Sequence, residues 1–167
     1  MGPRRKEAAK RSIPHQARRG NVPVPERLRA LDRIERQAVL ATESEGQPYT
    51  SLVSFALLPS LKGAVFATTK ATFKYRNIRE NARVALFIDN RSKREADLLE
   101  AEAVTILGTA RPIRRGKRWK ELAQILIRKH PSLSTFVRDP STALVLIEAA
   151  HCLHVSRFQT VSRWDVT

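Results

Sequence analysis

Hydrophobic and polar positions alternate over short stretches along most of this chain, which is the pattern of half-buried β-strands. Valine, threonine and aromatic residues are concentrated in the same stretches and also favour strands. Seven such runs can be delimited, at residues 38–42, 49–58, 64–69, 83–89, 101–113, 142–148 and 152–158. Turn residues separate the first three runs, at 45–48 (Glu-Gly-Gln-Pro) and 59–63, so we expect antiparallel hairpins there.

Three other segments have apolar residues at helical spacing, around residues 26–38, 72–81 and 119–129. Thr72 is suited to cap the second helix, and His130–Pro131 ends the third. Six or seven short strands with few, short helices predict a mainly β fold, a small antiparallel barrel. The strands do not alternate with long helices, which argues against a doubly wound parallel sheet.

The chain is long enough for one domain, which we expect over residues 25–167. Residues 1–24 lack periodicity and contain Pro14, Gly20 and Pro23, so we expect a flexible basic N-terminal arm. The arm has no apolar stretch of the kind found in a secretory signal, and no apolar run is long enough to span a bilayer. A single cysteine permits no intramolecular disulfide, and we expect a cytoplasmic protein with no membrane partner.

The net charge of +15 favours binding of phosphate groups, whether in nucleic acid or in a phosphorylated cofactor. Part of this charge lies in residues 1–20, and much of the rest forms clusters at residues 70–79, 91–94 and 114–120. Each cluster is equally compatible with a solvated basic surface. Aromatic residues make up only 6% of the chain and offer few platforms for stacking bases, which makes nucleic acid the less favoured partner.

Several motifs of known chemistry do not occur in this sequence. Its six glycines are scattered, so neither a dinucleotide-binding GxGxxG motif nor a P-loop is present. No serine occupies a GxSxG turn, which argues against a hydrolase of that type. His151, Cys152 and His154 are candidate metal ligands, but no fourth partner stands at a suitable spacing, so we expect no metal.

The segment from Ala67 to Lys74 has the features of an anion site. A strand ends in Ala67-Thr68-Thr69, a short loop follows, and Thr72 begins a helix with Lys74 in its first turn. Hydroxyls, free backbone N–H groups and the helix dipole then point at one place, where Lys74 adds a full positive charge. Lysine at a helix N-terminus is unfavourable for the helix alone and makes better sense with an anion beside it. An ordinary N-cap next to a solvated lysine is the alternative.

The same region resembles the pyridoxamine 5'-phosphate oxidase-like flavin proteins. The resemblance rests on GQPYTSLVSFALL (46–58), GAVFATTKATFK (63–74) and NIRENARVALF (77–87), in the order and spacing of that family. The individual matches are Leu40–Ala41–Thr42, Gly46–Gln47–Pro48, Thr68–Thr69, Thr72, Lys74, Asn77 and Asn81–Ala82–Arg83–Val84. It covers residues 35–113 well, and the segment from Trp119 to Trp164 also looks like a subgroup of uncharacterised members.

This resemblance implies a split barrel of the FMN-binding type, in which FMN lies between the two subunits of a homodimer. By position, the ribityl phosphate would be held by Thr68, Thr69, Thr72 and Lys74. The flavin ring would be lined by backbone and side chains of Thr50, Ser51, Leu52, Val53 and Ser54, with Ala67 nearby. Trp164 would cover the ring from the partner chain. A phosphate needs donors and positive charge, and a flavin ring needs a flat apolar wall with a few polar contacts, so the residues agree with this assignment.

The function implied by the resemblance is that of an FMN-dependent oxidoreductase whose substrate and electron donor are unknown. No catalytic residue can be assigned. Related split barrels carry deazaflavin or haem, so the fold does not fix the ligand. A flavin-, haem- or deazaflavin-binding module without turnover is therefore the alternative, and a basic nucleic-acid-binding protein is a less favoured one.

We expect that the protein is not an efficient pyridoxamine 5'-phosphate oxidase. In the true oxidases, the strand after the Gly-x-Pro turn carries an arginine and a lysine that reach phosphate. Ser51 and Ala56 occupy those positions here and supply no charge. The Arg-x-His-x-Arg signature of the oxidases is also missing, because Arg157 and Arg163 do not have its spacing.

Overall fold

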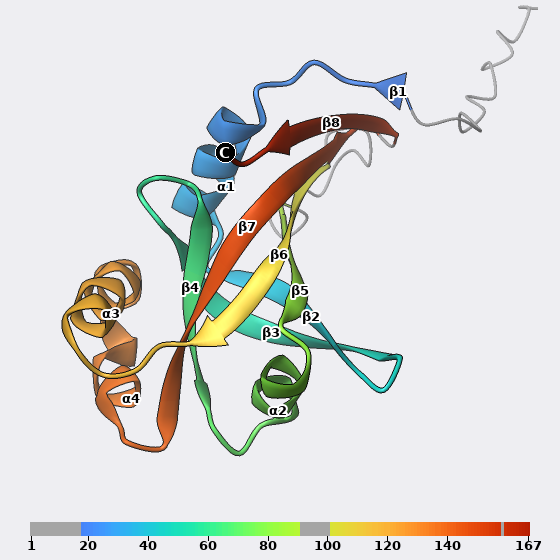
Figure 1. The fold of residues 1–167 in the computed structure, drawn as a ribbon. Helices are drawn as coiled ribbons and strands as arrows, with labels where there is room; N and C mark the ends of the chain where they lie inside the picture. Colours follow the sequence, from blue (N-terminus) through green and yellow to red (C-terminus); the bar gives the residue numbers. More distant parts are fainter. Residues whose placement is uncertain (1–17, 91–100, 158) are drawn as a thin grey trace, which may run out of the picture.

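Six antiparallel strands form a closed barrel in the computed structural model, which describes residues 18–90, 101–157 and 159–167 (Figure 1). Around the barrel the order is β7-β4-β3-β2-β5-β6, and β6 pairs with β7 to close it. The strands are β2 (Gln37–Ser44), β3 (Gln47–Leu57), β4 (Gly63–Thr69), β5 (Arg83–Asp89), β6 (Glu102–Pro112) and β7 (Thr142–Ser156). The predicted mainly β, antiparallel barrel is confirmed.

The hairpin between β2 and β3 forms where the turn residues predicted it. Glu45 and Gly46 have φ angles of 51° and 82°, and Ser44 pairs with Gln47 across them. A two-residue loop with both residues at positive φ matches the right-handed twist of the flanking strands. Pro48 lies within β3 rather than in the turn.

Strand β7 is one continuous strand of 15 residues where the sequence suggested two. Its pairing with β6 shifts between Leu107 and Gly108, so that Ala150 has no partner in the ladder. This is a β-bulge, which inserts one residue and reverses which side chains face the barrel interior. Gly108 allows the close approach there, since a Cβ on it would lie 2.0 Å from the carbonyl oxygen of Glu148. The predicted break at 149–151 is therefore a bulge.

Two strands lie outside the barrel and were not predicted. β8 (Thr160–Asp165) pairs antiparallel with the second half of β7, and β1 (Arg18–Arg19) pairs parallel with β8. The backbone N–H of Val22 donates to Ser162 Oγ over 3.1 Å, and Val24 is buried. The described part of the expected arm, residues 18–24, therefore packs against the domain and is not free. Residues 1–17 lie outside the described residues, so the expectation for them stays a prediction.

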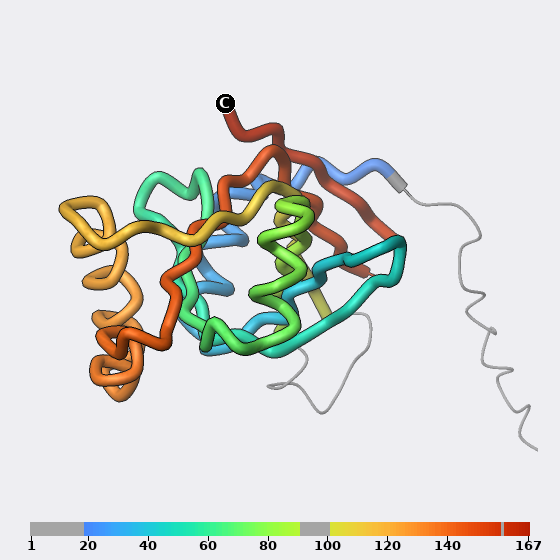
Figure 2. Tube along the Cα trace, turned by 60° about the horizontal axis from the view of Figure 1, so that its bottom comes forward, coloured from blue at the N-terminus to red at the C-terminus, as the bar shows by residue number. Residues whose placement is uncertain are grey.

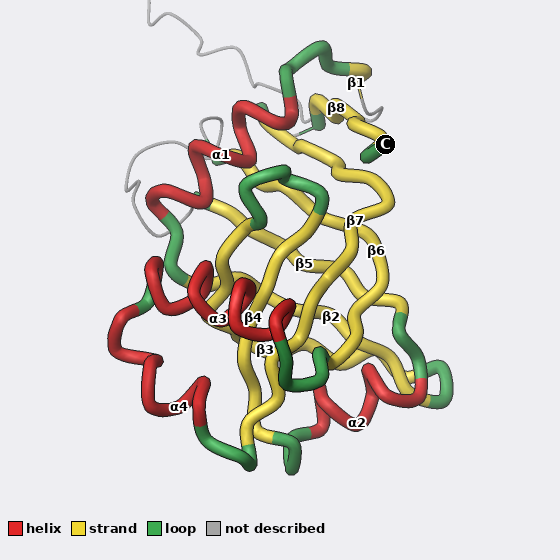
Figure 3. The backbone as a smooth tube through the Cα atoms, turned by 60° about the vertical axis from the view of Figure 1, so that its left-hand side comes forward, coloured by secondary structure: helices red, strands yellow, loops and turns green. Residues whose placement is uncertain are grey.

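The helices cover the ends and one side of the barrel (Figures 1 and 3). They are α1 (Val24–Ile34), α2 (Phe73–Glu80), α3 (Lys117–Lys129), a 3₁₀ turn (Pro131–Leu133) and α4 (Ser134–Arg138). The apolar face of α1 joins the core inside the barrel through Val24, Leu28 and Leu31. A second core lies outside the barrel, where α3 packs on β3, β4 and β7. The three predicted helices are present, and α3 ends at His130–Pro131 as expected.

A partly buried ionic contact fixes α1 to the barrel wall. Arg27 forms a two-pronged ion pair with Glu102 at the start of β6, and His154 Nε2 lies 2.9 Å from Glu102 Oε2. Burial alone would raise the pKa of Glu102, but the hydrogen bonds from Arg27 and His154 outweigh it and hold that pKa below its ordinary value. The carboxylate therefore stays ionised and joins α1, β6 and β7.

Over the ranges that the structure describes, we find no helix with the length and apolar character that crossing a bilayer requires.

The single cysteine gives a direct test of the barrel core. Cys152 is fully buried, and burial raises the pKa of its thiol to about 11. Since only the thiolate is nucleophilic, we expect a disulfide reagent such as DTNB to leave the native protein unmodified at pH 8. One thiol per chain should react in guanidinium chloride. Rapid modification without denaturant would show that β7 is not packed as described.

Candidate functional site

Helix α2 lies across one end of the barrel and is anchored there from its inner face (Figure 2). Ile78 belongs to the barrel core, and the buried Asn77 donates from Nδ2 to Thr42 Oγ1 on β2 over 3.0 Å. This hydrogen bond satisfies two buried polar groups and fixes the rotation of the helix. The N-terminal turn of α2 is thereby held at the rim of the barrel, directly after the end of β4.

The threonines before α2 form a chain of hydrogen bonds with one another. Thr72 occupies the N-cap position as predicted, but its side chain does not cap the helix. Its hydroxyl donates to the carbonyl oxygen of Thr69 over 2.9 Å, and Thr68 Oγ1 lies 3.1 Å from Thr72 Oγ1. Since Thr72 has only one hydroxyl proton, Thr68 is the donor to Thr72. Both protons are therefore committed within the chain, and only Thr69 keeps a hydroxyl for a ligand.

The start of α2 remains the candidate anion site because of its backbone and Lys74. No side chain caps the first N–H groups, and the first turn contains no acidic residue. Uncapped N–H groups carry the positive end of the helix dipole. Lys74 is half-buried, and its ammonium makes no hydrogen bond or ion pair with any described residue. Phosphate would satisfy both the backbone donors and this charge.

Alternation along β3 divides the five residues expected to line a flavin. Leu52 pairs with Val39 and Ser51 with Leu40, so that Thr50, Leu52 and Ser54 face outward. Ser51 and Val53 face inward, and Val53 belongs to the barrel core. Ser51 and Val53 would therefore meet the ring only through their backbone, and the expectation that backbone and side chains of these five residues line it stays a prediction. A strand cannot present five successive side chains to one ligand.

Alternation also divides β4, the neighbouring strand. Ala67 and Thr69 lie on its outer face, next to the second core, whereas Thr68 is buried and faces the barrel interior. Five candidate residues on these two strands therefore share the outer surface: Thr50, Leu52, Ser54, Ala67 and Thr69. The outer surface beside the α2 N-terminus is where a ring attached to a bound phosphate would lie.

Exposed aromatic side chains lie at the start of α2 and at the neighbouring end of β3. Phe73, the first residue of α2, is 62% exposed, and its ring centroid lies 6.0 Å from that of Tyr49 on β3. Arg76 stacks over Phe73 at 4.4 Å from the ring centroid. Leu52 is 57% exposed on the outer face. Large apolar side chains that remain this exposed point to a surface that meets a ligand or another protein.

On its other side, α2 borders a basic cavity of about 240 Å³, between α2, the end of β6 and the start of β7. Its cationic residues are Lys70, Arg79, Arg114 and Arg115, and its other walls include Tyr75, Trp119 and Thr142. Thr142 Oγ1 is buried there without a hydrogen-bond partner among the described residues. A buried hydroxyl rarely stays unpaired, so it is available to a ligand or a water in this cavity.

The sequence did not predict this cavity. The basic clusters at residues 70–79 and 114–120 were both evident, but their convergence depends on the barrel bringing α2 next to the β6–α3 connection. Thr142 carries no signal in the sequence, because an unpaired hydroxyl is visible only once its neighbours are known.

Trp164 lies far from these residues within one chain. It sits on β8, opposite Cys152 of β7, at the end of the barrel away from α2 (Figures 1 and 3). The expectation that it covers a flavin therefore requires a second subunit, and it stays a prediction.

The histidines and the cysteine near the C-terminus do not form a metal site in the described part of the chain. His154 and Cys152 share the inner face of β7, as the spacing predicted, and His151 lies on the opposite face. His154 is bonded to Glu102, and His130 Nε2 lies 2.8 Å from the carbonyl oxygen of Phe55. No group of three or more potential ligands occurs among the residues that the structure describes.

Comparison with known proteins identifies the family. A family profile described as pyridoxamine 5'-phosphate oxidase matches residues 24–156, which is most of the chain. This chain belongs to the pyridoxamine 5'-phosphate oxidase family. The predicted resemblance is therefore confirmed. A sequence search of curated proteins found no match.

Solved structures with this fold carry different names. A heme binding protein from Mycobacterium smegmatis aligns with a TM-score of 0.76 and 18% identity, over 87% of this chain and 59% of that one. The heme storage protein HutZ from Vibrio cholerae aligns with a TM-score of 0.64 and 16% identity, over 75% and 88%. An FAD-binding protein from Mesorhizobium loti aligns with a TM-score of 0.64 and 14% identity, over 80% of this chain and 94% of that one. The chain thus spans about three fifths of the length of the Mycobacterium protein. At these identities the likeness concerns the fold.

Within the family, the matched segment includes every part of the α2 site. Thr68, Thr69, Thr72 and Lys74 all fall within residues 24–156, and the structure brings them together at one rim of the barrel. β8 with Trp164 lies beyond the matched segment.

Proposed function

We propose that this protein binds FMN, with the phosphate at the N-terminus of α2 and the flavin ring along the outer faces of β3 and β4. The observation that carries the proposal is the uncapped first turn of α2 with an unpaired Lys74 beside it. Thr69, which keeps its hydroxyl proton, adds a further donor. The donor set matches a phosphate dianion better than any cation or neutral ligand.

The flavin supplies redox chemistry when bound, and the chain's own residues bind and orient it. Leu52 and Ala67 provide an apolar outer wall for the ring, and Ser54 provides a hydroxyl beside it. Lys74 and the helix N-terminus fix the phosphate end. We propose an oxidoreductase activity on this basis, with the substrate site formed over the same outer wall.

We propose that the site is completed by a second copy of the chain. The basic cavity beside α2 holds about 240 Å³, below the ~300 Å³ at which pockets for whole small-molecule ligands begin. The outer faces of β2 and β5 carry half-buried apolar residues, Val39 opposite Phe87 and Ala41 opposite Ala85. This face continues to the exposed Leu52. A symmetric dimer would bury the apolar face and enclose the ring.

A haem-binding module is the second candidate. Two proteins of similar fold are described as haem-binding and haem storage proteins. His151 is the only histidine of the described ranges that is both partly exposed and free of a recorded hydrogen bond, so it is the candidate axial ligand. It lies on β7, away from the α2 site, and the geometry at α2 suits phosphate. We therefore place FMN first.

A substitution of Lys74 tests the phosphate site. Lys74→Ala should weaken FMN binding by about 1.5–3 kcal/mol, the cost of losing a charged hydrogen bond, and should leave riboflavin binding unchanged. A fluorescence titration of each flavin measures both constants. Lys120→Ala, on the exposed side of α3, is the matched control and should behave as the parent. Equal losses for FMN and riboflavin would remove Lys74 from the phosphate site. If haemin binds in place of FMN and His151→Ala abolishes its Soret band, the second candidate holds.

The mass of the protein in solution tests the dimer. Sedimentation velocity of the FMN-loaded protein should give twice the mass of one chain. Leu52→Arg places a charge on the apolar face and should shift the protein to monomer while weakening FMN binding. Thr109→Arg, at an exposed position of β6, is the control for added charge. A monomeric parent with flavin bound at full affinity would contradict the shared site.

We expect that pyridoxamine 5'-phosphate and pyridoxine 5'-phosphate are not efficient substrates. Ser51 faces into the barrel and Ala56 is covered by α3, so neither position can hold a substrate phosphate as the corresponding residues of the true oxidases do. Losing two such contacts weakens binding by roughly 100-fold or more. Anaerobic addition of pyridoxamine 5'-phosphate or pyridoxine 5'-phosphate should leave the bound FMN oxidised. Fast bleaching at micromolar substrate would restore the oxidase assignment.

A further inference from the structure

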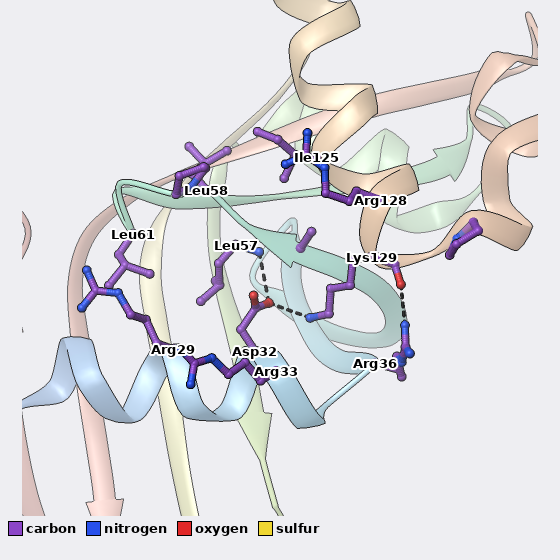
Figure 4. A pocket seen from close by; sticks show the side chains of 13 residues that line it. Arg29, Asp32, Arg33, Arg36, Leu57, Leu58, Leu61, Ile125, Arg128 and Lys129 are labelled. Carbon is purple, nitrogen blue, oxygen red and sulfur yellow. Dashed lines mark hydrogen bonds and ion pairs between the residues drawn. The ribbon is translucent and has the colours of Figure 1, made fainter.

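A second cavity lies on another side of the molecule, between α1, α3 and the turn after β3 (Figure 4). It is open to solvent and has a volume of about 660 Å³, within the range of pockets for small organic ligands. Its floor is apolar and comes from β3, the turn and α3: Ala56, Leu57, Leu58, Pro59, Leu61, Ile125 and Pro131. Its rim carries five cationic side chains and one carboxylate: Arg29, Arg33, Arg36, Arg128, Lys129 and Asp32.

Three of these charged residues hold the walls together. Lys129 Nζ lies 2.6 Å from Asp32 Oδ1, which also accepts the backbone N–H of Leu57 over 3.2 Å. Arg36 donates to the carbonyl oxygen of Lys129 at the end of α3. Burial lowers the pKa of Lys129, and the hydrogen bond that its ammonium donates to Asp32 counters that effect. These contacts join α1, β3 and α3 and give the cavity rigid walls.

The other three cations have no such role. Arg29, Arg33 and Arg128 make no hydrogen bond or ion pair with any described residue. Arg33 and Arg128 lie in the last turns of their helices, where the dipole favours positive charge. Arg29 lies in the middle of α1, where it gains nothing from the dipole. Arg29 and Arg33 are one turn apart and face the same cavity as Arg128 (Figure 4). Like charges gathered around one cavity repel one another unless an anion is bound.

The turn that forms one wall adopts an unfavourable backbone conformation. Leu61 has a φ of 60°, in the left-handed region that branched, bulky residues avoid, and its side chain is 5% exposed. Its N–H donates to the carbonyl oxygen of Leu58 over 2.8 Å. Conformations of this kind are unfavourable in themselves and are often found at ligand sites. Here the strained turn lines the apolar floor.

We infer that this cavity binds an organic phosphate, a small anion with at least two negative charges attached to an aromatic or aliphatic body. Guanidinium groups pair with phosphate through two parallel hydrogen bonds, and three of them at the rim have no partner among the residues that the structure describes. The apolar floor would receive the uncharged body. The site lies apart from the N-terminus of α2 and does not depend on FMN binding there.

The probe for this site is the fluorescent nucleotide mant-ADP, with mant-adenosine as its uncharged counterpart. The titration is run with FMN present in excess, so that the α2 site is filled. We expect mant-ADP to bind with a Kd below about 100 μM and mant-adenosine at least about tenfold more weakly, because the phosphates supply the charged contacts. Arg33→Gln combined with Arg128→Gln should weaken mant-ADP about tenfold or more. Arg29→Gln alone should weaken it to a smaller extent.

Lys117→Gln combined with Lys120→Gln is the matched control, since it removes the same charge from exposed positions of α3. This variant should bind mant-ADP as the parent does, and so should Lys74→Ala. An equal loss in the lysine pair would mean attraction by the overall charge and would overturn the proposal. A loss confined to Lys74→Ala would place the probe at α2 and would also overturn it. Equal binding of mant-ADP and mant-adenosine would also overturn the proposal, and so would binding of single-stranded DNA without binding of mant-ADP. A parent protein that binds no mant-ADP sinks the proposal whether or not FMN binds.

Discussion

The hydrogen-bonded ladder between β6 and β7 closes the barrel, and the rest of the structure depends on this closure. β6 follows β5 at one edge of the sheet and β7 follows β4 at the other, so the sheet stays open without this ladder. Closure removes both unpaired edges and encloses a continuous apolar core. It also brings the end of β6 beside the start of β7, where the basic cavity next to α2 forms.

The helices use the barrel in different ways, and this separates the two candidate sites. α2 closes one end through Ile78 and Asn77, so its first turn must lie at the rim with its N–H groups outward. α1 packs against the core near the opposite end and is fixed by Arg27 and Glu102. α3 covers the outer wall and leaves a cavity against α1. The cations beside α2 and those around the cavity between α1 and α3 therefore lie on different sides of the barrel, although the sequence shows only a large positive charge.

Much of the fold could be predicted from local patterns, because strand alternation, turn chemistry and helical spacing are short-range properties. The turn at Glu45–Gly46 and the end of α3 at His130 are examples. β8 was missed because residues 160–165 are polar and exposed in part, and they become a strand only by pairing with β7. The residues before α2 were recognised as a group. Their hydroxyl chain was not, since it depends on the three-dimensional position of Thr68 relative to Thr72. The cavity between α1 and α3 was also not predicted, because its walls come from segments about a hundred residues apart.

The bulge at Ala150 has a consequence for how this chain can vary. Before the bulge, odd-numbered residues such as Val145 and Ile147 face the interior. After the bulge, even-numbered residues such as Cys152 and His154 do. The extra residue therefore changes which residue numbers, odd or even, carry the inward-facing side chains in the two halves of β7. Removing Ala150 would leave Ala149 and His151 adjacent, opposite the adjacent residues Gly108 and Leu107, so that Cys152 and His154 would still face inward. Ala150 is thus the position of β7 at which the loss of one residue keeps the inner and outer surfaces as they are, whereas a change of one residue in the regularly paired parts of β7 exchanges them on one side of the change.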